Sequence, residues 1–138
     1  MTWNRILIFS TLLVFAPASL LRAEENLDCA NAMTQADMNQ CAHREFEEAD
    51  KELNVIWEAA RQRARKLDEQ NDAEVKGAEA ALLAAQRGWI AYRDGHCELG
   101  GWEAHGGSMK PLLVWDCKAE LTQERTKQLK KFVEGSGY

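Results

Sequence analysis

The feature that most constrains this chain is a helical repeat of apolar and small residues in three long segments. In each segment these residues recur at steps of three or four, which places them on one face of an α-helix. The expected inward-facing residues are Met38, Ala42, Phe46, Ala49, Leu53, Ile56, Ala60, Ala64 and Leu67 in the first segment, Val75, Ala78, Leu82, Ala85, Trp89, Tyr92 and His96 in the second, and Leu112, Trp115, Ala119, Thr122, Thr126, Leu129 and Val133 in the third. No segment alternates as a strand does. The pattern therefore predicts an all-α fold, an antiparallel three-helix bundle.

Capping residues mark where these helices begin and end. Thr34 with Asp37 three residues later is typical of a capping box. Ser108 is the expected cap of the third helix, with Pro111 tolerated in its first turn and Gly135 after its end. The second helix is expected to begin near Asp72, after a short loop at 68–71. A longer glycine-rich loop, 98–108, precedes the third helix.

The first residues have the layout of a secretory signal peptide. A short basic opening precedes the apolar run Ile6–Phe15, and small residues follow it. Cleavage after Ala18 and cleavage after Ala23 both fit, so we expect a signal peptide over 1–23 and a helical domain over 24–138. The apolar run is short for a membrane span. The prediction is a periplasmic or secreted protein without stable membrane insertion after cleavage.

Four cysteines remain in the expected mature chain: Cys29, Cys41, Cys97 and Cys117. An even number in an exported chain indicates two disulfides. The bundle brings all four near one end, which leaves all three pairings open. We favour Cys29–Cys41, which ties down the N-terminal arm, and Cys97–Cys117, which closes the glycine-rich loop. The gaps of 12, 56 and 20 positions do not resemble the closely spaced pairs of a zinc site, and we expect no metal and no cofactor.

The charge of the mature chain indicates which partners suit it. Removing residues 1–23 removes two of the 17 basic residues and none of the 22 acidic ones, so the net charge changes from −5 to −7. An acidic surface disfavours nucleic acid and favours a basic protein partner.

The stretch QRGWIAYRDGHC, residues 86–97, mixes aromatic, charged and cysteine side chains. We interpret it structurally, with Trp89 and Tyr92 as core and Gly88 as a point of close helix approach. Arg93 and Asp94 are expected to brace the end of the bundle through ion pairs with Asp50, Arg125 or loop carbonyls. A catalytic alternative would join Ser108, His105 or His96, and Asp94, but no strand-turn-helix elbow presents the serine. His43, His96 and His105 lack metal-ligand spacing. We therefore predict a protein that is not an enzyme.

The glycine-rich loop holds the candidate binding residues Trp102, Glu103 and His105. An aromatic and two titratable groups on a loop held by a disulfide can form a binding hot spot. The alternative is that Trp102 folds back and covers the end of the bundle.

These motifs resemble a known family. The segments DCANAMTQADMNQCA, ADKELN, AQRGWIAYRDGHC and GGS, followed by C-x-x-x-L-T-x-x-R, are similar to the LprI-type lysozyme-inhibitor domain from about Asp28 to Leu129. The resemblance implies a small exported bacterial helical domain. It also implies that its signature residues are structural: Asp50, Asn54, Trp89, Arg93, Asp94, Thr122 and Arg125.

Two functions follow as expectations. The first is a binding protein that inhibits a basic, lysozyme-type muramidase through the Trp102–His105 loop. The second is an envelope scaffold or adaptor that recognises another protein through exposed large residues, for which Trp57 and Leu113 are candidates.

Overall fold

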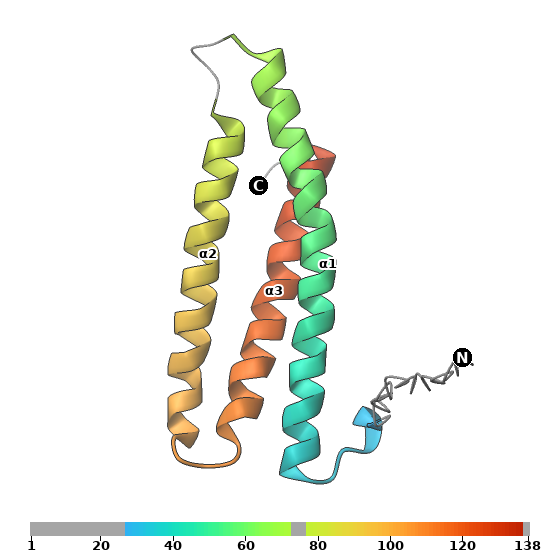
Figure 1. Ribbon diagram of the computed structural model, residues 1–138, viewed down its shortest axis with the longest axis vertical. Helices are drawn as coiled ribbons and strands as arrows, with labels where there is room; N and C mark the ends of the chain where they lie inside the picture. Colours follow the sequence, from blue (N-terminus) through green and yellow to red (C-terminus); the bar gives the residue numbers. More distant parts are fainter. Residues whose placement is uncertain (1–26, 73–76, 137–138) are drawn as a thin grey trace, which may run out of the picture.

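The computed structural model describes residues 27–72 and 77–136, and its long helices form one antiparallel bundle (Figure 1). They are α1 (Gln35–Gln70), α2 (Ala78–Gly100) and α3 (Lys110–Glu134), with short 3₁₀ helices η1 (Cys29–Asn31) and η3 (Gly101–Ala104). The predicted fold class is confirmed. The expected signal peptide lies outside the described residues. No helix of these two ranges is long and apolar enough to cross a membrane.

The ends of the helices follow local capping, with two differences from expectation. Thr34 caps α1 as predicted, and its hydroxyl accepts a hydrogen bond from the Asp37 amide at 3.1 Å. The prediction for Ser108 was wrong: Met109 occupies the N-cap of α3 without a side-chain cap, and the Ser108 carbonyl instead accepts from Asn39 of α1. Gly135 ends α3 as expected, in a left-handed conformation at φ 74° that glycine adopts without steric cost.

The connection between α1 and α2 differs more from the prediction than the helix caps do. α1 continues to Gln70, and α2 begins at Ala78 rather than near Asp72. The expected inward residue Val75 lies outside the described residues. Asp68, expected in a loop, is on α1, and its carboxylate accepts from the backbone amides of Gly77, Ala78 and Glu79 at 2.7, 2.8 and 3.0 Å. One helix thus supplies the N-terminal cap of the next, which sequence spacing alone did not indicate.

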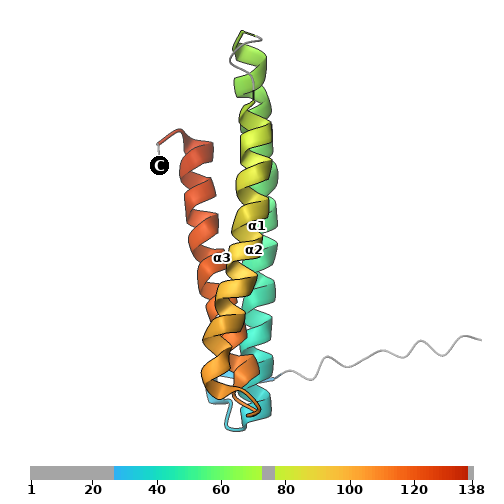
Figure 2. The ribbon, with the colours of Figure 1, turned by 90° about the vertical axis from the view of Figure 1, so that its left-hand side faces the viewer.

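The closest packing joins α1 and α3, which lie side by side in both views (Figures 1 and 2). α1 turns small side chains inward at Ala42, Ala49, Ala60 and Ala64, as predicted. Leu53 of α1 and Leu129 of α3 are buried in the central cluster. Because small side chains let two helix backbones approach, this contact is tight but buries little apolar volume.

The predicted inner face of α2 is confirmed at Ala78 and Leu82 but was wrong at Ala85, Tyr92 and His96. Its buried residues are Leu82, Gln86, Arg93 and Cys97, whereas Tyr92 is 57% exposed and Ala85 and His96 are also exposed. Trp89 packs partly buried against the core, as expected. The apolar period misled here because α2 buries polar side chains and turns small and aromatic ones outward.

Both favoured disulfides are present, and both lie at the end where α1 and α3 begin. Cys29–Cys41 and Cys97–Cys117 have Cα–Cα distances of 5.6 and 5.5 Å. In the chain-entropy description a crosslink that closes a loop of this second size contributes about 3 kcal/mol. Arg44 adds to the first crosslink by donating to the Leu27 carbonyl at 3.2 Å, so the N-terminal arm is fixed on α1.

The Asp68 cap gives the first prediction. Asp68→Ala removes the acceptor for three amides at the start of α2, so we expect the free energy of unfolding to fall by about 1–2 kcal/mol. Chemical denaturation of oxidised protein measures this change. The exposed neighbour Glu69 provides the control, since Glu69→Ala should cost less than about 0.5 kcal/mol. Equal losses in the two variants would contradict the capping role.

Candidate functional site

The family-like signature residues meet in a polar cluster between the three helices, which we call the Arg93 cluster: Asp50, Trp89, Arg93, Asp94 and Thr122. Arg93 is only 8% exposed. Its guanidinium donates to Asp94 at 3.0 Å and to the Thr122 hydroxyl at 3.3 Å, and it lies 3.6 Å from an Asp50 oxygen. The cluster therefore links α1, α2 and α3 through one side chain.

Aromatic rings enclose the same guanidinium. Its central carbon lies 5.0 Å from the Trp89 ring centre and 5.1 Å from that of Phe46, within the range of cation–π attraction. Asn54 donates to Asp50 at 3.0 Å and holds that carboxylate in place. These contacts join the signature residues to one another, although the side chains of Asp50 and Asp94 remain 40% and 45% exposed.

A second buried polar contact extends the cluster along α3. Arg125 donates to Gln86 of α2 at 3.0 Å, and the Thr126 hydroxyl donates to the Thr122 carbonyl at 2.9 Å. Polar groups taken from water must be paired in this way to avoid a large penalty. Gln86 was not singled out from sequence, although its position seven residues, or two turns, before Arg93 places it on the same face of α2.

Asp94 illustrates the electrostatics of the cluster. Partial burial opposes its ionisation, but hydrogen bonds from Arg93 and from Lys118, 3.2 Å away, outweigh that effect and hold the pKa of the carboxyl below its ordinary value. Asp94 is thus an ionised anchor between two cations. In a catalytic triad the aspartate accepts from the histidine, whereas here one Asp94 oxygen is held by Arg93 and Lys118.

The candidate binding loop is a defined 3₁₀ turn rather than a lid. Trp102 is 53% exposed, and its indole stacks on the His105 ring with centroids 4.2 Å apart and an interplanar angle of 14°. The ammonium of Lys110 lies 5.5 Å from the indole centre. The two rings are therefore held together at the surface, and the prediction that Trp102 folds over the end of the bundle is not supported.

The base of the loop is fixed by close backbone packing. Gly101 is buried, and a Cβ there would lie 2.6 Å from a Val114 methyl group, so only glycine fits against α3. A hollow of about 550 Å³ borders the loop, lined by His96, Leu99, Gly100, Trp102, Glu103 and Cys117. Of the three candidate residues, Trp102 and Glu103 line this hollow. The His105 ring stacks on the Trp102 indole.

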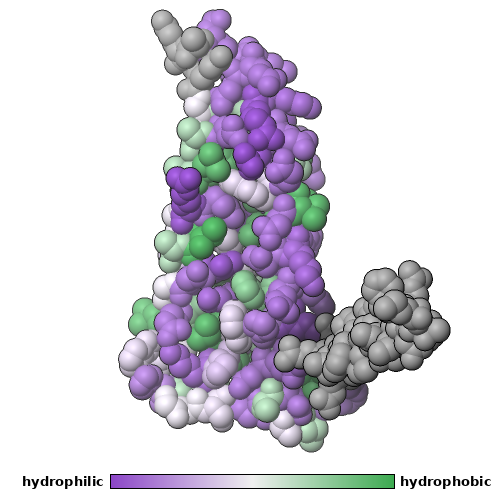
Figure 3. Space-filling model, in the orientation of Figure 1, coloured by the Kyte–Doolittle hydropathy of each residue, from purple (hydrophilic) through white to green (hydrophobic). Residues whose placement is uncertain are grey.

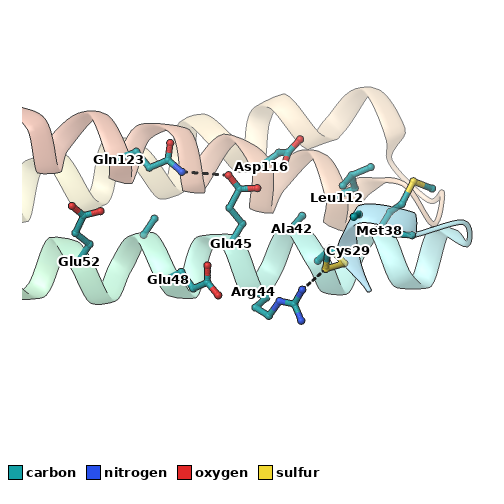
Figure 4. Close-up of a pocket in the computed structure, with 14 residues that line it drawn as sticks. Cys29, Met38, Ala42, Arg44, Glu45, Glu48, Glu52, Leu112, Asp116 and Gln123 are labelled. Atoms are coloured by element: carbon teal, nitrogen blue, oxygen red, sulfur yellow. Dashed lines mark hydrogen bonds between the residues drawn. A yellow bond between two sulfur atoms is a disulfide. The ribbon is translucent and has the colours of Figure 1, made fainter. Parts of the chain in front are cut away.

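A larger and more polar groove of about 880 Å³ lies between α1 and α3, beside the N-terminal arm (Figure 4). Its acidic side chains are Glu45, Glu48, Glu52 and Asp116, with Arg44 at one edge. Glu45 accepts from Gln123 at 3.3 Å and Glu52 from Lys130 at 2.6 Å. Sequence spacing alone does not place Asp116 beside the α1 carboxylates, since that requires the pairing of α1 with α3.

The histidines considered for the catalytic and metal-site alternatives pack against aromatic rings. His43 meets the edge of Trp115 at 4.4 Å, and His96 stacks on Tyr92 at 5.2 Å. Among the residues the structure describes, no three His, Cys, Asp or Glu side chains are placed to hold a metal ion.

Substitution of Arg93 tests the cluster. Arg93→Met keeps a similar length but removes hydrogen bonds to Asp94 and Thr122 and the cation beside Asp50, so we expect a loss of about 2–3 kcal/mol in the free energy of unfolding. Urea denaturation of this variant and of Lys66→Met, an exposed cation on α1, gives the comparison. A loss below that of the Lys66 control would show that the cluster contributes no net stability.

Asp94 gives a prediction for the stability of the protein at acidic pH. Because its folded pKa lies below the ordinary value of 3.8, its contribution is complete above that pH and is lost as pH falls through the lower folded pKa. The free energy of unfolding of Asp94→Asn should therefore vary less with pH below about 4 than that of the original protein. Denaturation curves from pH 2 to 6 measure both slopes, and identical slopes would refute the assignment.

Comparison with known proteins agrees with this architecture. Residues 28–129 match the family model described as "Lysozyme inhibitor LprI". The chain is 48% identical over 124 residues to an uncharacterized protein of Rhizobium meliloti (strain 1021), with 88% of each chain covered. No solved structure gives a significant match. Since the family match spans nearly the whole described helical domain, the chain belongs to the LprI lysozyme inhibitor family.

Proposed function

We propose that this protein is an exported, non-enzymatic binding protein that inhibits a lysozyme-type muramidase. Family membership over residues 28–129 is the observation that carries the proposal. The expected signal peptide supports a periplasmic or secreted location. The partner would be a basic lysozyme-like protein, and no bound cofactor is required.

The Trp102–His105 loop is the proposed contact. Its indole is more than half exposed yet fixed by the His105 stack, by Lys110 and by the close seat of Gly101 on Val114. A large aromatic side chain that is ordered before binding loses little entropy in the complex. Such a residue beside a hollow that a partner side chain can enter is typical of an interface hot spot.

The acidic groove between α1 and α3 supports the choice of a basic partner. Glu45, Glu48, Glu52 and Asp116 line one continuous surface, and the expected mature chain carries a net charge of −7. Long-range attraction from such a surface speeds encounter with a cationic protein and weakens as salt screens it. The groove would therefore contribute to the association rate, and the loop to the lifetime of the complex.

Titration of the mature protein against c-, g- and i-type lysozymes, with cell-wall clearance as the readout, tests the proposal. We expect inhibition of at least one class. Trp102→Ala should weaken it about 30-fold or more, because a hot-spot truncation costs 2 kcal/mol or more. Val55→Ala is the control, since Val55 is 70% exposed on α1 and far from the loop. Raising the salt concentration should lower the rate at which the original protein and Trp102→Ala associate with the lysozyme.

Failure to slow any lysozyme class at saturating concentrations would refute inhibition of those enzymes. Recovery of one stoichiometric partner that is not a lysozyme from envelope extracts would instead favour the scaffold or adaptor function. The surface candidates first considered for that function, Trp57 and Leu113, are partly buried, and Trp57 packs against the core, so they do not serve it.

A further inference from the structure

The outward face of α2 differs from the rest of the surface in its lack of charge. Of the 14 exposed residues on α2, only Arg87 and Glu98 are acidic or basic, compared with nine of 15 on α1 and six of eight on α3. Figure 3 shows the same contrast, with hydrophobic and weakly polar residues frequent along the α2 side and hydrophilic ones covering most of α1. Depletion of charge with exposed aromatic residues is the compositional mark of the centre of a protein interface.

The centre of this face is a straight stripe, which we call the α2 outer stripe: Ala81, Ala84, Gly88, Tyr92, Gly95 and Leu99. All six residues are exposed, with Tyr92 at 57% and Leu99 at 70%. In Figure 2 α2 lies in front of α1, with its outer side toward the viewer and no other described element across it. The stripe ends at the hollow that Leu99 shares with Trp102.

No described residue of the same chain packs closely against the two glycines of the stripe. A Cβ at Gly88 or at Gly95 would meet nothing within 4 Å, so the expectation that Gly88 admits a neighbouring helix of the same chain was wrong. Each glycine costs an exposed helix about 1 kcal/mol relative to alanine. Glycine on a helix face is useful when another helix must approach the backbone closely, and here that helix would have to come from another molecule.

We propose that the α2 outer stripe is the contact of a symmetric homodimer in which two α2 helices pack antiparallel. The stripe is graded in size: its first half is Ala81, Ala84 and Gly88, and its second half contains Tyr92 and Leu99. Antiparallel pairing about an axis between Tyr92 and Arg93 places Leu99 of one copy over Ala84 and Gly88 of the other, while the two Tyr92 side chains meet at the axis. A two-fold interface requires a surface that is complementary to itself in this way.

The two charges of this face satisfy the same symmetry. Arg87 and Glu98 are 11 residues apart, close to three helical turns, so both lie on the same flank of the stripe. When two such helices pair antiparallel about an axis between Tyr92 and Arg93, the same flanks face one another, and each Arg87 lies opposite the partner's Glu98. Glu98 already contacts Lys110 of its own chain, and Arg87 of the partner would approach from the open side.

The homodimer is inferred without reference to muramidase binding, but a dimer would affect that binding. Leu99 belongs both to the stripe and to the hollow beside Trp102, so dimerisation would cover part of the proposed inhibitory loop. The dimer and the inhibitory complex would then compete, and inhibition per chain would fall as the protein concentration rises. A variant that stays monomeric should inhibit at least as well as the original protein.

Analytical ultracentrifugation of the oxidised mature protein over a range of concentrations tests the dimer. We expect a reversible monomer–dimer equilibrium with a dissociation constant in the micromolar range. Gly88→Glu, which places a charge beneath the partner's Leu99, should weaken association by tenfold or more. Val55→Glu introduces the same charge at an exposed apolar position of α1 and should leave association unchanged. Circular dichroism confirms that both variants stay folded.

A charge exchange tests the antiparallel register. Arg87→Glu alone and Glu98→Arg alone each place like charges opposite one another, so each should be monomeric where the original protein is dimeric. An equimolar mixture of the two variants restores both opposite-charge pairs and should dimerise. A monomeric original protein at the highest soluble concentration would overturn the proposal, as would equal effects of Gly88→Glu and Val55→Glu, or a mixture that stays monomeric.

Lysozyme titration of Gly88→Glu separates the two proposals. Loss of inhibition in this variant, without any self-association of the original protein, would assign the stripe to the muramidase and overturn the homodimer. Self-association that depends on Gly88 in a protein without inhibitory activity would support the homodimer while refuting the proposed function.

Discussion

The close approach of α1 and α3 through small side chains is the constraint on which the rest of the structure depends. Ala42, Ala49, Ala60 and Ala64 bring the α1 backbone toward α3, so this pair fills its own interface with little apolar volume. α2 completes the bundle with a narrow buried face that contains one leucine, one tryptophan and two polar residues. A core this small leaves stability dependent on contacts that are not apolar.

Two kinds of contact, the Arg93 cluster and the disulfides, add stability that the small apolar core does not provide. Arg93 connects three helices through Asp50, Asp94 and Thr122, and its burial ties the position of α2 to the geometry of one guanidinium. The disulfides fix the end of the bundle where the arm and the η3 loop lie. The η3 loop, which is the proposed contact, thus stands on an end of the bundle held by two crosslinks, and the rings of Trp102 and His105 stack on one another within it.

The three helices divide the surface by charge. α1 and α3 carry the acidic groove that suits encounter with a basic protein, and α2 carries the uncharged stripe that suits a second copy of itself. The η3 loop lies where the uncharged face meets the end of the bundle, within reach of both kinds of contact.

The sequence by itself determined the three helices, the Thr34 cap, the bundle topology and the inward faces of α1 and α3, because these follow from local periodicity and short connections. It favoured the disulfide pairs that form, but the nearness of all four cysteines to one end left the choice among three pairings to the tertiary structure. It also placed Trp102, Glu103 and His105 on one loop. Only the tertiary structure decided which face of α2 is buried, because an arginine and a glutamine are admitted to the interior when partners from other helices pair with them. The tertiary structure likewise decided that Asp68 caps α2, that Asp116 joins the acids of α1, and that Tyr92 and His96 face water, since each depends on a neighbour distant in the chain.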